Sequence, residues 1–140
     1  MAKGILSGIA GEALVVSQIS KSGHIATFTS KNTPNFDVLA TNLTGTKFVA
    51  IQVKTSSDGK KFVLSQKDEQ WACSGSDVLY ALVDLKNEEI FYVLASEVSL
   101  IISTHHKSRV ANGVKDNPMR EIYKAKISHV KPNDISILGL

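Results

Sequence analysis

The sequence predicts a single α/β domain. Three observations predict this class: an opening stretch with the apolar spacing of a helix, three short β-forming segments separated by turn residues, and a later alternation of helical and strongly apolar segments. The chain has 140 residues, the size of one ordinary domain, and no Pro- or Gly-rich linker divides it. We therefore expect residues 1–140 to form one domain.

The first half of the chain is expected to form a helix followed by three strands. Apolar residues recur every three or four positions over residues 4–21, and Gly23 then supplies a stop. Strand-forming segments follow at residues 24–29, 36–42 and 47–56. Only a short turn separates the last two segments, which predicts a β-hairpin.

The second half is expected to alternate helices and strands. A short helix is predicted over residues 66–74, and the strand predicted over 77–85 is so apolar that we expect both of its faces to be covered. A tight turn then leads to a strand over 90–96 and a helix over 97–104. The remaining chain is expected to run through loops to one or two last strands.

Two polar residues stand out on the strand predicted over residues 47–56. Gln52 and Lys54 are two positions apart, so their side chains share one face. Val49, Ile51 and Val53 alternate with them and can face the core. Because burial of an unpaired ammonium is costly, we expect Lys54 to have a partner, unless it lies at a strand edge and extends into solvent.

Two acids are candidates for the same region. Asp37 begins the neighbouring strand of the predicted hairpin, so its carboxylate can approach Gln52 and Lys54; a turn Asp that caps the strand is the alternative. Glu12 lies on the first helix, where the residues three and four positions away are small or apolar. A carboxylate on that face needs a cation or a donor, unless it points to water.

Together these side chains suit the hydrolysis of a phosphodiester. Such a reaction uses a hard divalent cation held by oxygen ligands, which stabilises charge on the phosphate and activates a water. The two carboxylates and the amide oxygen are suitable ligands, and a nearby lysine can orient the water or neutralise the transition state. We therefore hypothesise a Mg²⁺ site, with Mn²⁺ as a substitute.

Three segments resemble the signature of a known nuclease group. They are GE at 11–12, PNFDVLA at 34–40 and IQVKTSS at 51–57, which are similar to the motifs of the PD-(D/E)xK superfamily of restriction-endonuclease-like nucleases. The closest likeness is to small single-domain endonucleases with a QVK-type motif, and it covers roughly residues 4 to 95. The resemblance implies a central mixed β-sheet flanked by helices in the order αβββαβ, with the active site at one sheet edge.

The resemblance also implies roles for individual residues. Asp37 corresponds to the principal metal ligand, and Lys54 corresponds to the catalytic lysine. Glu12 matches the helical acid that completes the site in several branches, and the backbone carbonyl of Val53 corresponds to a further ligand. Gln52 stands where most members have a second acid. Because a neutral amide is a weaker Mg²⁺ ligand than a carboxylate, Gln52 favours one metal ion over two.

The activity implied by the resemblance is that of a metal-dependent endonuclease acting on DNA, with RNA left open. Gln52 supports an alternative, in which the same fold has lost turnover and binds nucleic acid or a protein partner. Many nucleases of this kind work as dimers because cutting two strands takes two sites. A homodimer is therefore a further expectation.

A cationic segment is expected to contact the polyanion. Residues 105–131 contain seven basic and two acidic residues, a net charge of +5, whereas the rest of the chain carries −2. We expect this segment to bind phosphates, which makes binding salt-sensitive; a solvated surface is the alternative. The candidate contacts are Lys107, Arg109, Lys115 and Arg120.

The remaining residues do not predict a disulfide, a membrane-spanning helix or a zinc site. Cys73 is the single cysteine, so no internal disulfide is expected, which fits a reducing compartment such as the cytoplasm. No apolar run approaches the ~20 residues of a membrane-spanning helix, so no membrane partner is expected. Zinc binding by His105 and His106 is not expected because adjacent residues seldom face the same way. We expect Trp71 to belong to the core rather than to stack on a base.

Overall fold

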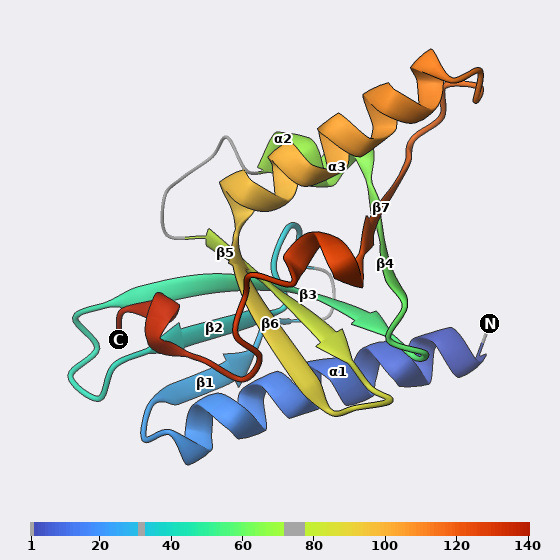
Figure 1. The fold of residues 1–140 in the computed structure, drawn as a ribbon. Coiled ribbons are helices and arrows are strands. Elements are labelled where there is room, and N and C mark those ends of the chain that lie inside the picture. Colours follow the sequence, from blue (N-terminus) through green and yellow to red (C-terminus); the bar gives the residue numbers. More distant parts are fainter. Residues whose placement is uncertain (1, 31–32, 72–77) are drawn as a thin grey trace.

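A computed structural model describes residues 2–30, 33–71 and 78–140 and shows a five-stranded main sheet flanked by helices (Figure 1). The strands are β1 (Ile25–Phe28), β2 (Val38–Thr41), β3 (Phe48–Ser56), β5 (Val78–Asp84) and β6 (Glu89–Leu94), in the order β1-β2-β3-β5-β6. Strands β3 and β5 are parallel, and the other neighbours are antiparallel. The main sheet is therefore mixed, as the resemblance implied.

The helices and a small ribbon complete the fold. The α-helices are α1 (Ala2–Lys21), α2 (Gln66–Trp71) and α3 (Ala95–Ala111). A two-stranded antiparallel ribbon consists of β4 (Lys61–Ser65) and β7 (Met119–Tyr123). Two short 3-10 helices follow at Lys124–Ile127 (η2) and Ser136–Leu138 (η3). None of the described helices is both long and apolar enough to span a membrane.

The main sheet separates two hydrophobic cores. Helix α1 lies along one face, and α2, α3 and the ribbon lie on the other side (Figure 1). The core on the α1 face contains Val15 and Ile19 from the helix and the alternating residues of β3, which are Val49, Ile51 and Val53. The core on the opposite face contains the following buried residues from the strands, the ribbon and α3: Phe62, Leu64, Tyr80, Leu82, Val98, Ile102 and Ile122.

Several predicted elements are confirmed. The hairpin predicted from residues 36–42 and 47–56 is formed by β2 and β3, with Val38 opposite Ile51. Strand β5 is buried along almost its whole length, because α1 covers one face and α3 the other. The second hairpin joins β5 to β6. The helix predicted over 66–74 is present as α2 up to Trp71, and its last predicted residues, with Cys73, lie outside the described residues.

Two predictions of local structure are corrected. The predicted order αβββαβ omits strand β4. This strand pairs with β7, near the end of the chain, so the burial of β4 depends on a partner far away in the sequence. Helix α3 is longer than the predicted 97–104 because its buried face continues past the apolar residues. Val98, Ile102 and His106 recur every four positions on that face, and the polar His106 masked the pattern.

Gly11 brings α1 into close contact with β3. A Cβ built on Gly11 would lie 1.9 Å from Oγ1 of Thr55, so this approach of helix to strand requires a residue without a side chain. Thr55 directly follows Lys54 on β3, and Glu12 directly follows Gly11 on α1. The contact therefore brings the helical acid close to the strand that carries the lysine.

Candidate active site

The carboxylate of Asp37 is fixed against β3. Its backbone N–H donates to the carbonyl oxygen of Ile51 at 2.9 Å, and its Oδ2 accepts a hydrogen bond from the N–H of Val53, also at 2.9 Å. The side chain thus continues the β2–β3 ladder just before β2 begins. Because Val53 lies between Gln52 and Lys54 in the sequence, the carboxylate is bonded to the stretch of β3 backbone that carries both residues.

Glu12 lies on α1, the helix that packs on one face of the main sheet, and approaches Asp37 from that helix. The pKa of the Glu12 carboxyl is raised above its ordinary value, first by burial, then by the negative charge of Asp37, and then by a hydrogen bond shared with Asp37. Among the described residues, no Lys, Arg or His forms an ion pair with either carboxylate. The two acids therefore form a pair whose mutual repulsion a bound cation would relieve.

Lys54 has an anionic partner, but the partner is not one of these acids. Its Nζ lies 3.6 Å from Oδ2 of Asp68, which is on α2. The sequence predicts a partner for Lys54, with a solvent-exposed strand edge as the alternative, and does not identify Asp68. A signal was available: Asp68 lies three residues after Ser65, a spacing at which an Asp side chain can accept a hydrogen bond from a backbone N–H near a helix start.

Gln52 shares a shallow hollow with Lys54. The hollow has a volume of about 160 Å³ and is lined by residues of α2, β3, the end of β4 and the loop before β2, which are Asn35, Gln52, Lys54, Ser65, Lys67, Asp68 and Trp71. Trp71 is buried and meets the Tyr80 ring edge-on, with centroids 5.3 Å apart, as expected of a core residue. The polar face of β3 is therefore accessible from this side.

The donor set in this region limits what it can bind. Within the described part of the chain, no three side chains of the types His, Cys, Asp or Glu are grouped closely enough to hold a metal ion. A cation here would have to combine the carboxylates of Glu12 and Asp37 with amide or backbone oxygens. Such an all-oxygen set suits Mg²⁺ or Mn²⁺ rather than zinc.

The four predicted phosphate contacts differ in their surroundings. Lys107 on α3 and Lys115 in the following loop are exposed, whereas Arg109 is partly buried and has its Nη1 3.8 Å from Glu121. Arg120 is only 5 % exposed and forms an ion pair with Glu69 on α2, besides donating to backbone oxygens. The prediction for Arg120 is therefore wrong: its guanidinium ties β7 to α2 and is not available to a phosphate.

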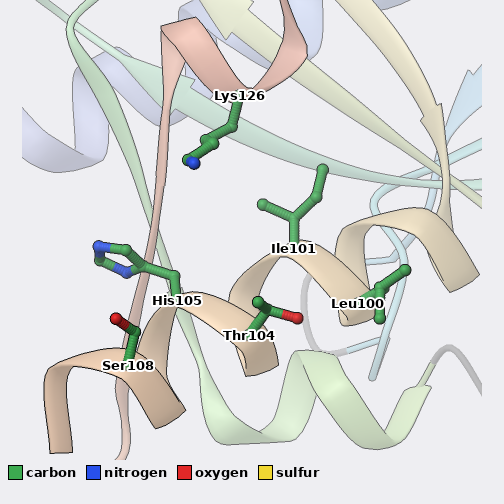
Figure 2. A pocket seen from close by; sticks show the side chains of 6 residues that line it. All are labelled: Leu100, Ile101, Thr104, His105, Ser108 and Lys126. Carbon is green, nitrogen blue, oxygen red and sulfur yellow. The ribbon is translucent and has the colours of Figure 1, made fainter. Parts of the chain in front are cut away.

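The two adjacent histidines face different neighbours. His106 is buried and its Nε2 lies 2.7 Å from Asp116, while the ring of His105 meets Tyr123 edge-on. Figure 2 shows His105 at a second hollow, where it lies with Leu100, Ile101, Thr104, Ser108 and Lys126 between α3 and η2. This lining contains no carboxylate and none of the predicted catalytic residues. It is therefore separate from the candidate active site.

Two solved structures with a similar overall arrangement are a Holliday junction resolvase and a homing endonuclease. The Holliday junction resolvase Hjc from the archaeal hyperthermophile Archaeoglobus fulgidus superposes with a TM-score of 0.63 and 14% identity, covering 94% of this chain and 95% of that one. The bacterial homing endonuclease I-Ssp6803I superposes with a TM-score of 0.51 and 12% identity, covering 84% of this chain and 72% of that one. No family model and no curated protein sequence matches the chain.

At these identities the likeness establishes the fold and nothing further. The chain has the restriction-endonuclease-like fold, as its sequence motifs implied.

Proposed function

We propose that this protein is a divalent-metal-dependent endonuclease that hydrolyses phosphodiester bonds in DNA. One observation carries the proposal: Glu12 and Asp37 form a carboxylate pair that has no cationic partner among the described residues, beside the strand that carries Lys54. An acid pair of this kind is stabilised by a bound divalent cation. The fold, which this chain shares with a Holliday junction resolvase and a homing endonuclease, supports the same conclusion.

The residues present fit a single Mg²⁺ or Mn²⁺ ion. Glu12 and Asp37 would hold the ion through carboxylate oxygens, and Gln52 would add its amide oxygen. The N–H of Val53 already points to Asp37, and because the N–H and C=O of one residue leave a strand on the same side, the Val53 carbonyl is a suitable further ligand. When bound, the metal supplies a Lewis acid for the phosphate and an activated water.

Lys54 would act on the phosphate rather than on the metal. Lys54 follows Val53, whose N–H is bonded to Asp37, so a phosphodiester bound next to the carboxylates would lie within reach of its positive charge. A fixed cation at that point stabilises the extra negative charge of the pentacovalent transition state. Removing the charge should therefore lower kcat more than it weakens DNA binding.

DNA is the proposed substrate, and exposed lysines on the α3 side would contact its phosphates. Lys107 and Lys115 are free of ion pairs among the described residues, and both belong to the segment with the +5 charge. Contacts of this type release counterions, so DNA affinity should fall steeply with salt concentration. RNA binding would be tested in the same titration.

The test is metal-dependent cleavage of supercoiled plasmid, linear duplex and four-way-junction DNA, with Mg²⁺, Mn²⁺ or EDTA. Wild type is compared with Asp37→Asn and Lys54→Met, which are close in size to the residues they replace. Asp134→Asn and Lys86→Ala, at exposed or partly exposed positions outside the site, serve as controls. We expect cleavage in wild type and both controls, and a loss of at least about 100-fold in the two site variants. Equal cleavage by all five proteins would refute the proposal.

A second candidate function is a module of the same fold that binds nucleic acid or a protein without cleaving. It is favoured by Gln52, a neutral side chain at the position of a usual second acid, and by the ion pair of Lys54 with Asp68. Calorimetric titration with Mn²⁺ separates the two candidates. Salt-sensitive DNA binding without any Mn²⁺ affinity would favour the module.

A further inference from the structure

Lys54 forms an ion pair with Asp68 and directly follows Val53, the residue whose backbone N–H is bonded to Asp37. Its Nζ is 3.6 Å from Asp68, and it forms no ion pair with Asp37 or Glu12. Asp37 is nevertheless close, since its carboxylate is bound to the N–H of Val53, the residue next to Lys54. Two carboxylates held next to each other without a cationic partner among the described residues should attract a free ammonium strongly.

The carboxylate of Asp68 is held in a fixed orientation by hydrogen bonds. The residue is 7 % exposed, and both carboxylate oxygens accept hydrogen bonds. Oδ1 accepts from the Tyr80 hydroxyl at 2.6 Å, and Oδ2 accepts from the backbone N–H of Ser65 at 2.7 Å. The carboxylate therefore cannot turn away from the hollow without breaking buried hydrogen bonds, which is costly.

The hydroxyl of Tyr80 is bonded to Asp68 and is also affected by the charge of Asp37. Tyr80 is fully buried, and its pKa is raised by burial, by its hydrogen bond to Asp68, by the charge of Asp68 and finally by the charge of Asp37. The hydroxyl thus stays protonated, donates to Asp68 and lies within the field of both acids. Asp68 and Asp37 are alternative destinations for the Lys54 ammonium, since a lysine stem is long and flexible.

We propose that Asp68 is a positioning residue that holds the Lys54 ammonium away from the Glu12–Asp37 pair, so that the pair remains open to a divalent cation. The inference rests on the proposed function and adds a residue that the motifs do not contain. Without the charge of Asp68, the Lys54 ammonium would pair with Asp37 or Glu12. It would then compete with the metal for the same carboxylate oxygens.

The experiment is a double-mutant cycle read out by Mn²⁺ affinity, measured by calorimetric titration of wild type, Asp68→Asn, Lys54→Met and the double variant. In Asp68→Asn, the amide oxygen can still accept from Ser65 and the amide NH₂ can donate to the Tyr80 hydroxyl. The change therefore removes charge with little loss of packing. Circular dichroism and thermal unfolding check that each variant is folded.

We expect Asp68→Asn to weaken Mn²⁺ binding about tenfold in the wild-type background and to have no effect in the Lys54→Met background. Tyr80→Phe, which removes one hydrogen bond to Asp68, should weaken Mn²⁺ binding by a smaller factor. Cleavage by Asp68→Asn should recover when Mn²⁺ is raised, so the variant is altered in its metal requirement.

Three outcomes would count against the proposals, and they are distinguishable. If Asp68→Asn binds Mn²⁺ like wild type, the positioning role is wrong while the proposed function stands. If the loss is the same with and without Lys54, Asp68 acts through the general fold and the positioning role is again wrong. If wild type itself binds no Mn²⁺, the proposed function fails, and the inference built on it fails too.

Discussion

The side chain of Asp37 accepts a hydrogen bond of 2.9 Å from the backbone N–H of Val53. This bond gives one carboxylate two roles, because it completes the pairing of β2 with β3 and presents an acid beside Gln52 and Lys54. Substitutions of Asp37 that keep the hydrogen bond but remove the charge can distinguish its role in the sheet from its proposed role in the site.

Asp37→Ala and Asp37→Asn should therefore differ in stability while agreeing in function. The alanine variant leaves the Val53 N–H without its acceptor and should lose about 1–2 kcal/mol of unfolding free energy in urea. The asparagine variant keeps an acceptor oxygen and should lose less than half of that. Both should lose Mn²⁺ affinity and cleavage. Full metal binding by Asp37→Asn would show that the charge of Asp37 is not needed.

Glu12→Gln should stabilise the metal-free protein at neutral pH. The folded-state pKa of Glu12 is raised from 4.5, so the folded protein holds this proton more tightly than the unfolded chain. The resulting stability is fully present below pH 4.5 and is lost as pH rises through the higher folded pKa. Glutamine cannot ionise and avoids this loss.

In thermal unfolding with EDTA, Glu12→Gln and wild type should have similar Tm at pH 4. At pH 7.5 the variant should melt about 2 °C higher. Saturating Mn²⁺ should reverse the order, since wild type gains binding energy that the variant lacks. A Tm difference that does not change between pH 4 and pH 7.5 would contradict the assignment of the raised pKa to Glu12.

Gly11→Ala should destabilise the protein by about 1–3 kcal/mol, because the new methyl group would overlap Thr55 and push α1 from the sheet. Gly8→Ala is the matched control on the same helix. Nothing lies within 4 Å of a Cβ at Gly8, so alanine there should stabilise by about 0.5–1 kcal/mol through helix propensity.

The cause of the Gly11 effect can be checked in a second background. Thr55→Ala removes the Oγ1 that a Gly11 methyl group would meet at 1.9 Å. In that background Gly11→Ala should cost clearly less unfolding free energy than in wild type. Equal costs in the two backgrounds would mean that another contact opposes the methyl group.

Arginine and lysine variants of the basic segment should separate into two groups. Arg120→Ala should lower stability by about 3–5 kcal/mol, since it breaks a buried ion pair and leaves Glu69 without its partner. Lys107→Ala and Lys115→Ala should leave stability unchanged and weaken DNA binding. Each should reduce the slope of log affinity against log salt by about 1.

These values come from urea unfolding and from fluorescence titration of labelled DNA at several salt concentrations. Lys86→Ala, in the turn between β5 and β6, is the control lysine outside the segment. An unchanged salt slope in Lys107→Ala and Lys115→Ala would place the DNA elsewhere on the protein.

Local patterns predict the strands and the helix that carry the candidate residues. Gln52 and Lys54 were placed on one face of a strand by the two-residue repeat, and a four-residue turn made the strand of Asp37 its neighbour. Both are short-range properties of the chain. Glu12 is a candidate because its helical neighbours are small or apolar. Gly11 supplies the physical reason, since it lets α1 approach β3.

Long-range pairings were not predictable in the same way. Strand β4 has only five residues and is paired with β7, so neither segment reveals its partner locally. Arg120 looked like one more cation in a basic segment, and only this pairing and the contact with Glu69 bury it. The length of α3 was underestimated because His106 takes an apolar position and is paired with Asp116.

The sequence by itself determined the α/β class, the hairpin that joins the Asp37 strand to the Lys54 strand, and the chemical types available for a metal site. Periodicity and turn residues act over a few positions, so a linear pattern suffices for them. Only the tertiary structure decided which charged side chains lie next to each other. The pairing of Lys54 with Asp68, of Arg120 with Glu69 and of Glu12 with Asp37 depends on how helices dock on the sheet, and that docking is settled by burial summed over the whole chain.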